Sequence, residues 1–449
     1  MKQYIHFIGI GGIGVSALAK YYLAKEYGVS GCDLIRSEIT DQLKKMGARV
    51  RIGKPNHACV PTGTNKIIYS PAVPQNHPEL LKAKNYKLKT LSYPEALGEL
   101  TKIYDTIAIS GTHGKSTTTS MIGLLLTKAG LDPTVIVGTK LKEFGDSNCR
   151  VGKGKYLVIE ADEHFASFLN YWPKIIVLTT IEADHLDYWK TLKNLIRGFQ
   201  RYTTHIPQDG TLVANKDDKN IRGILAKNRA RIQGYSLRQK EASTLRRILK
   251  VPGEHNVSNA LAALAVARIL EIKDTTSFRA LEEFHGTWRR FETFKLSTPK
   301  PYTLVSDYGH HPTEVAVTVK AARKKWPKKK IWLVFQPHQY QRTYYLWKDF
   351  VKVLSTLPIE KLIILDIYDV AGRERGSIRK KVSSAKLVEA IKERKPRYAA
   401  FHIPIVLEAK KLLKKSIQGQ EIVMIMGAGD IYNLTLGLTR KHPKRKIKA

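Results

Sequence analysis

The sequence contains few cysteines and no long apolar run. Its three cysteines, Cys32, Cys59 and Cys149, include no Cys-x-x-Cys pair. This excludes a disulfide scaffold, predicts no cysteine-based zinc site, and favours a reducing cytoplasm. No apolar run approaches the ~18 residues of a membrane helix, so membrane insertion is not expected. The N-terminus lacks the apolar segment and cleavage site of a signal peptide, which again predicts a cytoplasmic protein.

Acidic residues are also scarce. There are 39 Asp and Glu residues against 76 Lys and Arg, a formal charge of +37. Such an excess is typical of nucleic-acid-binding proteins, but a basic enzyme that handles anionic ligands explains it equally well. No RNA- or DNA-binding motif accompanies the charge, so nucleic acid is not expected as a partner. We interpret the basic runs at 323–330, at 373–381 and in the last ten residues as solvated surface.

The chain does have enough apolar residues for several cores. Hydrophobic residues make up 43% of its 449 residues, and this length suggests about three domains of ~150 residues. Strand-like and helix-like segments alternate, which predicts an α/β fold with doubly wound, mostly parallel sheets. We expect a Rossmann-like domain over 1–99, a P-loop ATPase-like domain over 100–293, and a second Rossmann-like domain over 294–449 that ends in a basic tail.

The first motif with a chemical implication is a glycine-rich loop. Gly9, Gly11 and Gly14 form GxGxxG between a strand-like run and a helix-like segment, and Asp33 follows at a typical distance. Such glycines let the backbone approach a pyrophosphate at a helix N-terminus. The motif fits the pyrophosphate of NAD and of a UDP-sugar alike. A NAD-dependent oxidoreductase therefore stays an alternative on this motif alone.

A second loop has the pattern of a P-loop. Gly111, Gly114, Lys115 and Ser116 form GxxGKS between another strand and helix, although Ile109 replaces the first glycine of the strict consensus. In such a loop, backbone N–H groups cradle phosphates, the lysine reaches the β- and γ-phosphates, and the serine hydroxyl binds Mg²⁺. The pattern predicts a nucleotide triphosphate site.

Two acidic clusters follow strand-like runs downstream of this loop. They are IEADE at 159–163 and IEADHLD at 181–187. Carboxylate oxygens are the ligands that Mg²⁺ prefers. Beside a phosphate loop, these clusters predict a magnesium site.

These motifs together resemble the Mur ligase family, in the family's order and over almost the whole chain. The segments that carry the resemblance are FIGIGGIGVSALA, GTHGKSTTT, IEADE, IEADHLD, PGEHNVSNALAALAVA, GTWRRFE, DYGHHPTEV, FQPHQYQRT and MGAGDIY. The resemblance implies three domains that bind a UDP-sugar, ATP and an amino acid. It also implies an ATP- and Mg²⁺-dependent amide ligase that works through an acyl phosphate. The branch it points to joins L-alanine to UDP-N-acetylmuramate, a step of peptidoglycan synthesis that supports cell shape and division.

The resemblance assigns roles to individual residues. The UDP pyrophosphate would be cradled by Gly9, Gly11, Gly12 and Gly14. ATP would be bound by Gly111, Thr112, His113, Gly114, Lys115, Ser116 and Thr117, with adenine contacts from His255, Asn256 and Asn259. A first Mg²⁺ would be held by Ser116 and Glu160, and a second by His185 next to the carboxylate of the UDP-sugar. The γ-phosphate would be reached by Arg290, and the substrate and amino-acid site would be lined by Tyr308, His310, His311 and Arg342. A base for the amine is expected in His310 or His311.

Three positions depart from the family pattern, and several alternatives stay open. Phe165 and Ser306 each replace a frequent aspartate, and Gln339 replaces an arginine that some members have, which leaves Arg342 to bind the amino-acid carboxylate. A recycling ligase of the same family, which attaches a preformed tripeptide to the same sugar, is the nearest alternative. The oligomeric state, monomer or dimer, stays open.

Overall fold

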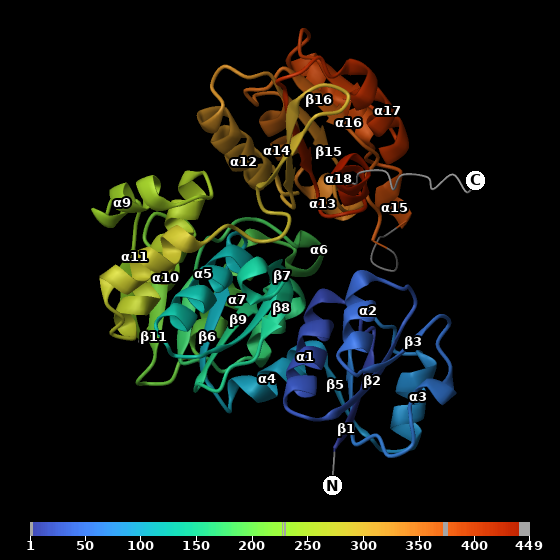
Figure 1. Ribbon diagram of the computed structural model, residues 1–449, viewed down its shortest axis with the longest axis vertical. Helices are drawn as coiled ribbons and strands as arrows, with labels where there is room; N and C mark the ends of the chain where they lie inside the picture. The colour runs from blue at the N-terminus through green and yellow to red at the C-terminus, as the bar shows by residue number, and fades with distance from the viewer. Residues whose placement is uncertain (1–2, 227, 229, 371–375, 440–449) are drawn as a thin grey trace, which may run out of the picture. The chain divides into compact units, whose positions relative to one another are not determined.

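The structure is a computed structural model that describes residues 3–226, 228, 230–370 and 376–439 (Figure 1). Its strands form three sheets, and the chain divides into two compact units. The first unit comprises residues 1–184, 188–250 and 255–287, and the second comprises 185–187, 251–254 and 288–449. The expected α/β class with three sheets is confirmed.

The first sheet is wholly parallel, in the order β3-β2-β1-β4-β5. Its strands are β1 (Tyr4–Ile8), β2 (Gly28–Asp33), β3 (Arg49–Ile52), β4 (Lys66–Tyr69) and β5 (Lys89–Ser92). Its helices are α1 (Ile13–Ala24), α2 (Glu38–Lys45), α3 (Pro78–Asn85) and α4 (Tyr93–Thr101), with the 3₁₀ turn η1 (His57–Cys59). The strand order reverses at β1. The glycine loop that follows β1 therefore lies at a topological switch point, where open α/β sheets bind ligands.

Four of the five residues of β1 are buried, because both faces of a parallel sheet are covered. Ile5 and Phe7 pack in one core with the helix α1 residue Leu18. Ile8 packs on the other face with the helix α3 residue Leu80. The helices on both faces thus fix the strand whose end carries the glycine loop.

The middle sheet has seven strands in the order β12-β11-β10-β6-β9-β7-β8, with β8 antiparallel to β7. Its strands are β6 (Asp105–Ser110), β7 (Thr134–Leu141), β8 (Ser147–Arg150), β9 (Tyr156–Ala161), β10 (Ile175–Leu178), β11 (Thr211–Asn215) and β12 (Arg231–Tyr235). Its helices are α5 (Lys115–Lys128), α6 (Leu186–Trp189), α7 (Leu192–Thr203), α8 (Lys219–Leu225), α9 (Glu241–Ile248), α10 (Glu254–Ile269) and α11 (Asp274–Glu283), with the 3₁₀ turns η2 (Lys142–Phe144) and η3 (His164–Asn170). Strands β6 and β9 are neighbours, so the P-loop after β6 and the acidic cluster at the end of β9 meet at one edge.

The third sheet has the order β13-β14-β18-β15-β16-β17, with β13 antiparallel to β14. Its strands are β13 (Glu292–Leu296), β14 (Tyr302–Asp307), β15 (Ile331–Phe335), β16 (Lys361–Ile364), β17 (Ala400–His402) and β18 (Ile422–Met426). Its helices are α12 (Pro312–Lys325), α13 (Tyr340–Tyr345), α14 (Trp347–Leu354), α15 (Gly376–Arg379), α16 (Ser384–Arg394), α17 (Val406–Ser416) and α18 (Tyr432–Thr439). The segments after β14 and β15 carry most of the site residues expected in this unit.

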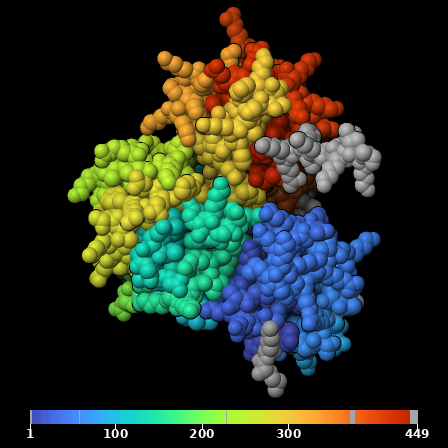
Figure 2. All heavy atoms as spheres, in the orientation of Figure 1, coloured from blue at the N-terminus to red at the C-terminus, as the bar shows by residue number. Residues whose placement is uncertain are grey.

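The first two sheets belong to one unit because α1 packs against β7 and β8. Figure 2 shows the N-terminal residues in blue against the middle residues in teal. Among the described residues, none of the helices is long and apolar enough to cross a membrane. The three cysteines are free and buried.

Candidate active site

The glycine loop after β1 is held by backbone and carboxylate acceptors on β2. The N–H groups of Gly9 and Ile10 donate to the Cys32 carbonyl at 2.9 and 3.0 Å, and the Gly11 N–H donates to Asp33 Oδ2 at 2.8 Å. Helix α1 then begins after Gly12 with no side-chain cap. Its first N–H groups and its positive dipole end are therefore directed at any anion that binds the loop.

The P-loop needs glycine at two positions for steric reasons. Gly111 and Gly114 have φ of 133° and 84°, which favour glycine. A Cβ atom at Gly111 would overlap the Thr179 hydroxyl, and one at Gly114 would lie 2.5 Å from Asn259 Oδ1. Both positions therefore require glycine, because the backbone conformation disfavours a side chain and the neighbouring residues leave no space for one.

The remaining loop residues are tied to the segment after β10. The Thr112 hydroxyl accepts from the Glu182 N–H at 2.9 Å, and the His113 N–H donates to Thr180 Oγ1 at 3.1 Å. Thr117 lies in the first turn of α5. The loop is therefore hydrogen-bonded to the segment after β10 at two successive residues.

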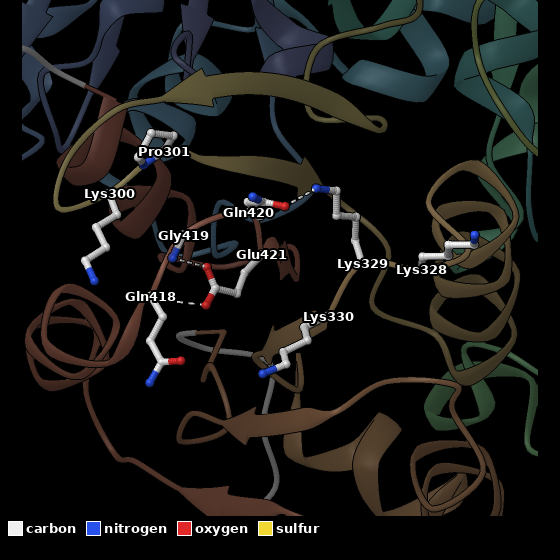
Figure 3. Close-up of a pocket in the computed structure, with 9 residues that line it drawn as sticks. All are labelled: Lys300, Pro301, Lys328, Lys329, Lys330, Gln418, Gly419, Gln420 and Glu421. Atoms are coloured by element: carbon white, nitrogen blue, oxygen red, sulfur yellow. Dashed lines mark hydrogen bonds between the residues drawn. The ribbon is translucent and has the colours of Figure 1, made fainter.

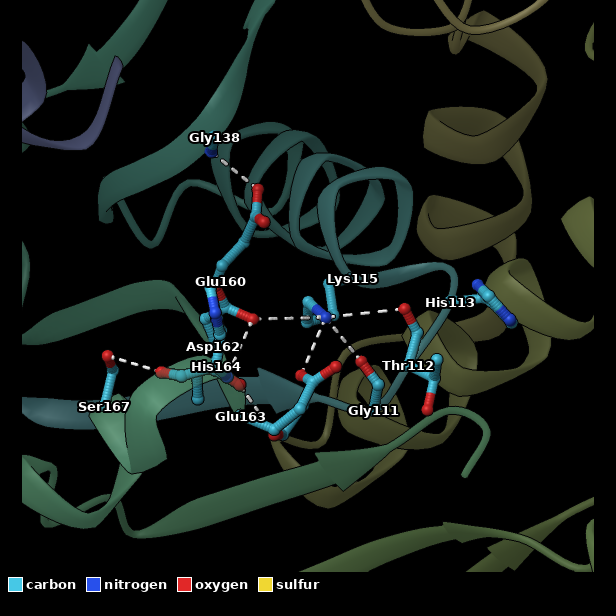
Figure 4. A network of polar contacts seen from close by, with 12 residues as sticks. Gly111, Thr112, His113, Lys115, Gly138, Glu160, Asp162, Glu163, His164 and Ser167 are labelled. Carbon is cyan, nitrogen blue, oxygen red and sulfur yellow. Dashed lines mark hydrogen bonds and ion pairs between the residues drawn. The ribbon is translucent and has the colours of Figure 1, made fainter. Parts of the chain in front are cut away.

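Lys115 is the centre of a polar network at the start of α5 (Figure 4). Its ammonium donates to the Gly111 carbonyl at 2.7 Å and to Glu163 Oε2 at 2.8 Å, and Asp162 Oδ1 lies 3.5 Å away. Burial opposes the charge on Lys115, but the carboxylates of Glu163 and Asp162 hold the pKa of its ammonium above the usual value. Lys115 is thus a permanent cation at the mouth of the loop.

A carboxylate on β9 meets the first hydroxyl of α5. Ser116 Oγ donates to Glu160 Oε2 at 3.1 Å, and the Gly138 N–H on β7 donates to Glu160 Oε1 at 2.6 Å. The hydroxyl and the carboxylate are both oxygen donors of the kind that Mg²⁺ prefers. The sequence-based pairing of Ser116 with Glu160 is therefore present as a contact.

The acidic residues around Lys115 outnumber its single positive charge. Burial raises the pKa of Glu160, against the stabilising Gly138 N–H. Burial likewise raises the pKa of Glu163 to about 7, although Lys115 opposes the rise. With Asp162, three carboxylates share one ammonium, and a bound divalent cation would relieve this excess of negative charge.

The expected adenine contacts lie in the first turns of α10. Asn256 and Asn259 are both buried, and the Asn259 amide donates to Asn256 Oδ1 at 3.4 Å. Asn259 is also the side chain that packs on Gly114 of the P-loop. His255 precedes them on the same helix and is half-buried. The structure therefore brings this group beside the phosphate loop.

In the second unit, Asp307 at the end of β14 joins the residue before β13 to the segment before α12. Its buried carboxylate accepts from the Phe291 N–H at 2.8 Å and from the Gly309 N–H at 2.7 Å. Burial raises the pKa of Asp307, against the nearby Arg290 charge. The Arg290 guanidinium lies 5.2 Å from the Tyr308 ring centre. These contacts bring together the RRF and DYGHH segments.

Glu314 on α12 joins three of the expected site residues. Its carboxylate accepts from the N–H groups of His310 and His311 at 2.9 and 3.2 Å, and Arg290 Nη1 lies 3.5 Å from its other oxygen. His311 Nδ1 in turn accepts from the Thr313 N–H and caps α12. His311 therefore has a structural role as a helix cap in this unit.

The segment after β15 supplies the second basic side chain. Arg342 is buried, and its Nη1 atom lies 3.3 Å from His338 Nδ1 and donates to Gln339 Oε1 at 3.2 Å. The His338 ring lies 5.3 Å from the His310 ring. Gln339, which departs from the family pattern, therefore orients Arg342.

Two further side chains are notable: Arg289 was not predicted as part of the site, and Phe165 departs from the family pattern. Arg289 is buried among the rings of Trp288, Tyr308 and Tyr432, and it donates to the Gly427 carbonyl at 2.6 Å. Burial lowers the pKa of Arg289. Phe165, by contrast, is exposed on η3, where it stacks on the neighbouring residue His164.

Sequence reasoning also missed the partners of its own site residues. Glu163 contacts Lys115 and Glu314 contacts His310; these contacts were not predicted, although the carboxylates lie in the segments IEADE and DYGHHPTEV. His185 has a left-handed φ of 50° and belongs to the second unit, whereas the Ser116 and Glu160 pair belongs to the first. The magnesium role of His185 therefore stays a prediction.

A lysine-rich hollow of about 490 Å³ lies in the second unit (Figure 3). It is lined by Lys300, Pro301, Lys328, Lys329, Lys330, Gln418, Gly419, Gln420 and Glu421. Lys329 donates to Gln420 Oε1 at 2.7 Å.

Most side chains of the 323–330 run are exposed, as expected for solvated surface. The last ten residues, and 373–375 of the run at 373–381, lie outside the described residues.

The chain belongs to the Mur ligase family. Three family descriptions match it: the "Mur ligase family, catalytic domain" over residues 4–104, the "Mur ligase middle domain" over 109–267, and the "Mur ligase, glutamate ligase domain" over 289–429.

Relatives within the family match the chain over nearly its full length. The UDP-N-acetylmuramate–L-alanine ligase of Paraburkholderia xenovorans is 38% identical, and that of Burkholderia mallei is 37% identical; each match covers 96% of both chains. The solved structure of the Thermotoga maritima UDP-N-acetylmuramate–alanine ligase is similar in fold, with a TM-score of 0.78 and 24% identity over 97% of this chain and 98% of that one. A murein peptide ligase from Psychrobacter arcticus has a TM-score of 0.71 and 21% identity, covering 98% of this chain and 100% of that one.

Proposed function

We propose that the protein is an ATP-dependent ligase that joins L-alanine to UDP-N-acetylmuramate in the cytoplasm. The observation that carries the proposal is the Lys115 network, in which a P-loop lysine faces a carboxylate cluster across two neighbouring parallel strands. The names of the 37–38% identical relatives support this choice of substrates. The free, buried cysteines suit the proposed compartment.

The reaction must bring two anions together. A carboxylate is a poor electrophile, so transfer of the γ-phosphoryl group to it gives an acyl phosphate, and attack by the amine then expels phosphate. Lys115 exchanges its Glu163 contact for phosphate oxygens, and the N–H groups at the start of α5 bind the same phosphates. Their role is to offset the repulsion and to hold the reactants in line.

Mg²⁺ fits the donors at the end of β9. Ser116 and Glu160 offer oxygen ligands, and the unbalanced carboxylates around Lys115 accommodate an added positive charge. When bound, Mg²⁺ would neutralise charge on the phosphates. Gly138 holds the Glu160 carboxylate so that one oxygen faces Ser116. His185 is proposed as a ligand of a second ion.

The other substrates are assigned to the remaining loops. The glycine loop over Gly9–Gly14 receives the UDP pyrophosphate, where the N–H groups of α1 face the ligand. Arg342 binds the amino-acid carboxylate, with Gln339 holding its guanidinium in place. Arg290 reaches the γ-phosphate, and His310 accepts a proton from the amine. We further propose that the UDP-sugar, ATP and the amino acid are bound by domains over 1–99, 100–293 and 294–449, respectively.

A ligation assay tests the function directly. The full chain is incubated with UDP-N-acetylmuramate, ATP and Mg²⁺, and with L-alanine, glycine, L-serine or the tripeptide as acceptor. Mass spectrometry should show an adduct with L-alanine that requires ATP and is matched by released phosphate. A product with the tripeptide alone would identify the recycling ligase instead. No ATP-dependent adduct with any acceptor would overturn the proposal.

A further inference from the structure

Three buried side chains of types that bind metal ions lie together on one face of the first sheet. His6 on β1 and Cys32 on β2 lie on one face of the sheet, because His6 pairs with Ser30 and Cys32 follows two residues later. Helix α3 covers this face and contributes Glu79. His6, Cys32 and Glu79 are 1%, 5% and 0% exposed, so bulk water does not reach them.

The cluster converges on a single carboxylate oxygen. His6 Nε2 and Cys32 Sγ each lie 2.9 Å from Glu79 Oε2. The other oxygen, Oε1, is buried and has no hydrogen-bond partner among the described residues. Leaving a buried carboxylate oxygen unpaired is costly, so hydrogen bonding within the triad does not fully account for the arrangement.

The donor atoms match those of a zinc site. One nitrogen, one sulfur and one carboxylate oxygen all lie within 4.8 Å of one another. Zn²⁺ takes this mixture of ligands, whereas Mg²⁺ prefers oxygen alone. A thiolate, a carboxylate and a neutral imidazole together carry two negative charges, which balance a divalent ion in a buried site.

The second nitrogen of the histidine has the support that metal-binding imidazoles require. His6 Nδ1 lies 2.8 Å from Ser30 Oγ, the residue opposite it on β2. When Nδ1 carries the proton and donates it to this hydroxyl, Nε2 is left with a lone pair directed at the cluster. The Ser30 hydroxyl thus offers an acceptor for the Nδ1 proton when Nε2 binds an ion in place of its hydrogen bond to Glu79.

We propose that His6, Cys32 and Glu79 form a site for a thiophilic divalent cation, with Zn²⁺ as its natural occupant. Binding deprotonates the Cys32 thiol and releases that proton to solvent, while Glu79 Oε1 supplies a fourth donor. The site is separate from the Ser116 and Glu160 pair. It departs from the expectation that the cysteine spacing allows no zinc site, because its ligands are 26 and 47 residues apart and meet only in the fold.

The site is connected to the glycine loop through one residue. The Cys32 carbonyl accepts the N–H groups of Gly9 and Ile10, so a shift of Cys32 on binding the ion is passed to the loop. Burial raises the pKa of the Cys32 thiol well above its usual range.

Cobalt titration of the metal-free full chain tests the site. Co²⁺ bound to a thiolate gives a sulfur-to-metal charge-transfer band in the near ultraviolet, which Co²⁺ at an oxygen-only phosphate site does not give. We expect one equivalent of this band per chain, displaced by Zn²⁺. Cys32→Ser keeps a donor for Glu79 and should remove the band and weaken Zn²⁺ binding by at least about 100-fold, beyond the loss caused by outer-shell changes.

The matched control is Cys59→Ser, a second buried cysteine in the same apolar core. It should keep the band. Zinc-edge X-ray absorption of the unmodified chain gives a readout that does not depend on a variant folding, with one sulfur at about 2.3 Å and nitrogen or oxygen at about 2.0–2.2 Å expected. A zinc spectrum without sulfur, absence of the cobalt band, or a band unchanged in Cys32→Ser would each overturn the proposal.

Discussion

Lys20 Nζ donates a 2.8 Å hydrogen bond to Asn148 Oδ1, and this buried contact joins α1 of the first sheet to β8 of the middle sheet. Ser147 Oγ lies 3.2 Å from the same ammonium. Burial lowers the pKa of Lys20. The helix that begins at the glycine loop is therefore anchored to the sheet that carries the P-loop.

Replacing the acceptor should destabilise this anchor. Asn148→Ala leaves the Lys20 ammonium buried without its shortest acceptor, and we expect a loss of about 1–3 kcal/mol in the free energy of unfolding, measured with urea. Lys20→Met removes the buried charge, so in that background Asn148→Ala should cost clearly less. Equal costs in both backgrounds would show that the contact does not stabilise the fold.

Lys115→Ala should abolish ligation but not sugar binding. The variant removes the cation that offsets the approach of carboxylate and γ-phosphate, and we expect the rate to fall by about 1,000-fold or more. Calorimetry should give an unchanged affinity for UDP-N-acetylmuramate, because the glycine loop follows a strand of the first sheet, whereas Lys115 follows a strand of the middle sheet. The control is Lys128→Ala at the far end of the same helix, where the lysine pairs with Glu283. Full activity in Lys115→Ala would remove the P-loop from the mechanism.

Glu160→Gln should raise the Mg²⁺ concentration required for activity. The amide keeps the Gly138 contact through its oxygen but lacks the charge of a magnesium ligand, so we expect an increase of about 10-fold or more in the half-saturating Mg²⁺. Asp105→Asn, at the start of β6 and paired with Lys155, is the charge-matched control. An unchanged Mg²⁺ requirement would place the ion elsewhere.

The metal-free protein should lose stability with rising pH through Glu163. Its pKa of about 7 in the folded chain exceeds the ordinary 4.5, so the folded chain retains a proton that the unfolded chain releases between these values. The free energy of unfolding therefore falls as pH rises from about 4.5 to about 7. Relative to Glu163→Gln, the natural chain should lose about 1–3 kcal/mol across this window. The stability of both proteins is measured against pH by thermal melting in the presence of a chelator. Parallel profiles would contradict the prediction.

Arg342→Lys should affect the amino acid more than the nucleotide. Lysine cannot make the forked contacts of a guanidinium, so we expect KM for L-alanine to rise by about 10-fold or more with little change in KM for ATP. Gln339→Ala, which removes one acceptor of Arg342, should have a smaller effect in the same direction. The control is Arg323→Lys, a residue that instead pairs with Glu360. Equal effects on both KM values would argue against this role.

The elements that the sequence predicts well are those with strong local patterns. Strand β1 is apolar apart from His6, strand β6 contains the apolar run Ile107–Ile109, and each precedes a glycine loop where expected. Strand β3 has the sequence RVRI and is partly exposed, so it has no such run and is not predicted. The antiparallel edge strands β8 and β13 are also missed, because their pairing depends on neighbours brought close by the fold. The domain limits near 99 and 293 stay a prediction.

The site is predictable where a motif fixes both residue and loop, as at Lys115 and Ser116. Its partners are not, because Glu163 lies 48 residues from Lys115 and only the order of β6 and β9 brings the two together. Arg289 lies in the quoted segment GTWRRFE, but its environment is not predictable, since the rings of Tyr308 and Tyr432 come from separate segments. The same reason hides the cluster around Glu79.

The contact between Gly138 and Glu160 has a genetic consequence. The donor is a main-chain N–H on β7, and every amino acid except proline supplies one. A side chain here is nevertheless constrained, because a Cβ atom would lie 3.2 Å from Glu160 Oε2. A substitution at residue 138 other than proline therefore keeps the main-chain hydrogen bond but shifts the Glu160 carboxylate, so inherited variants at this position should lower activity by degrees. A substitution of Ser116 instead removes its hydroxyl group in a single step.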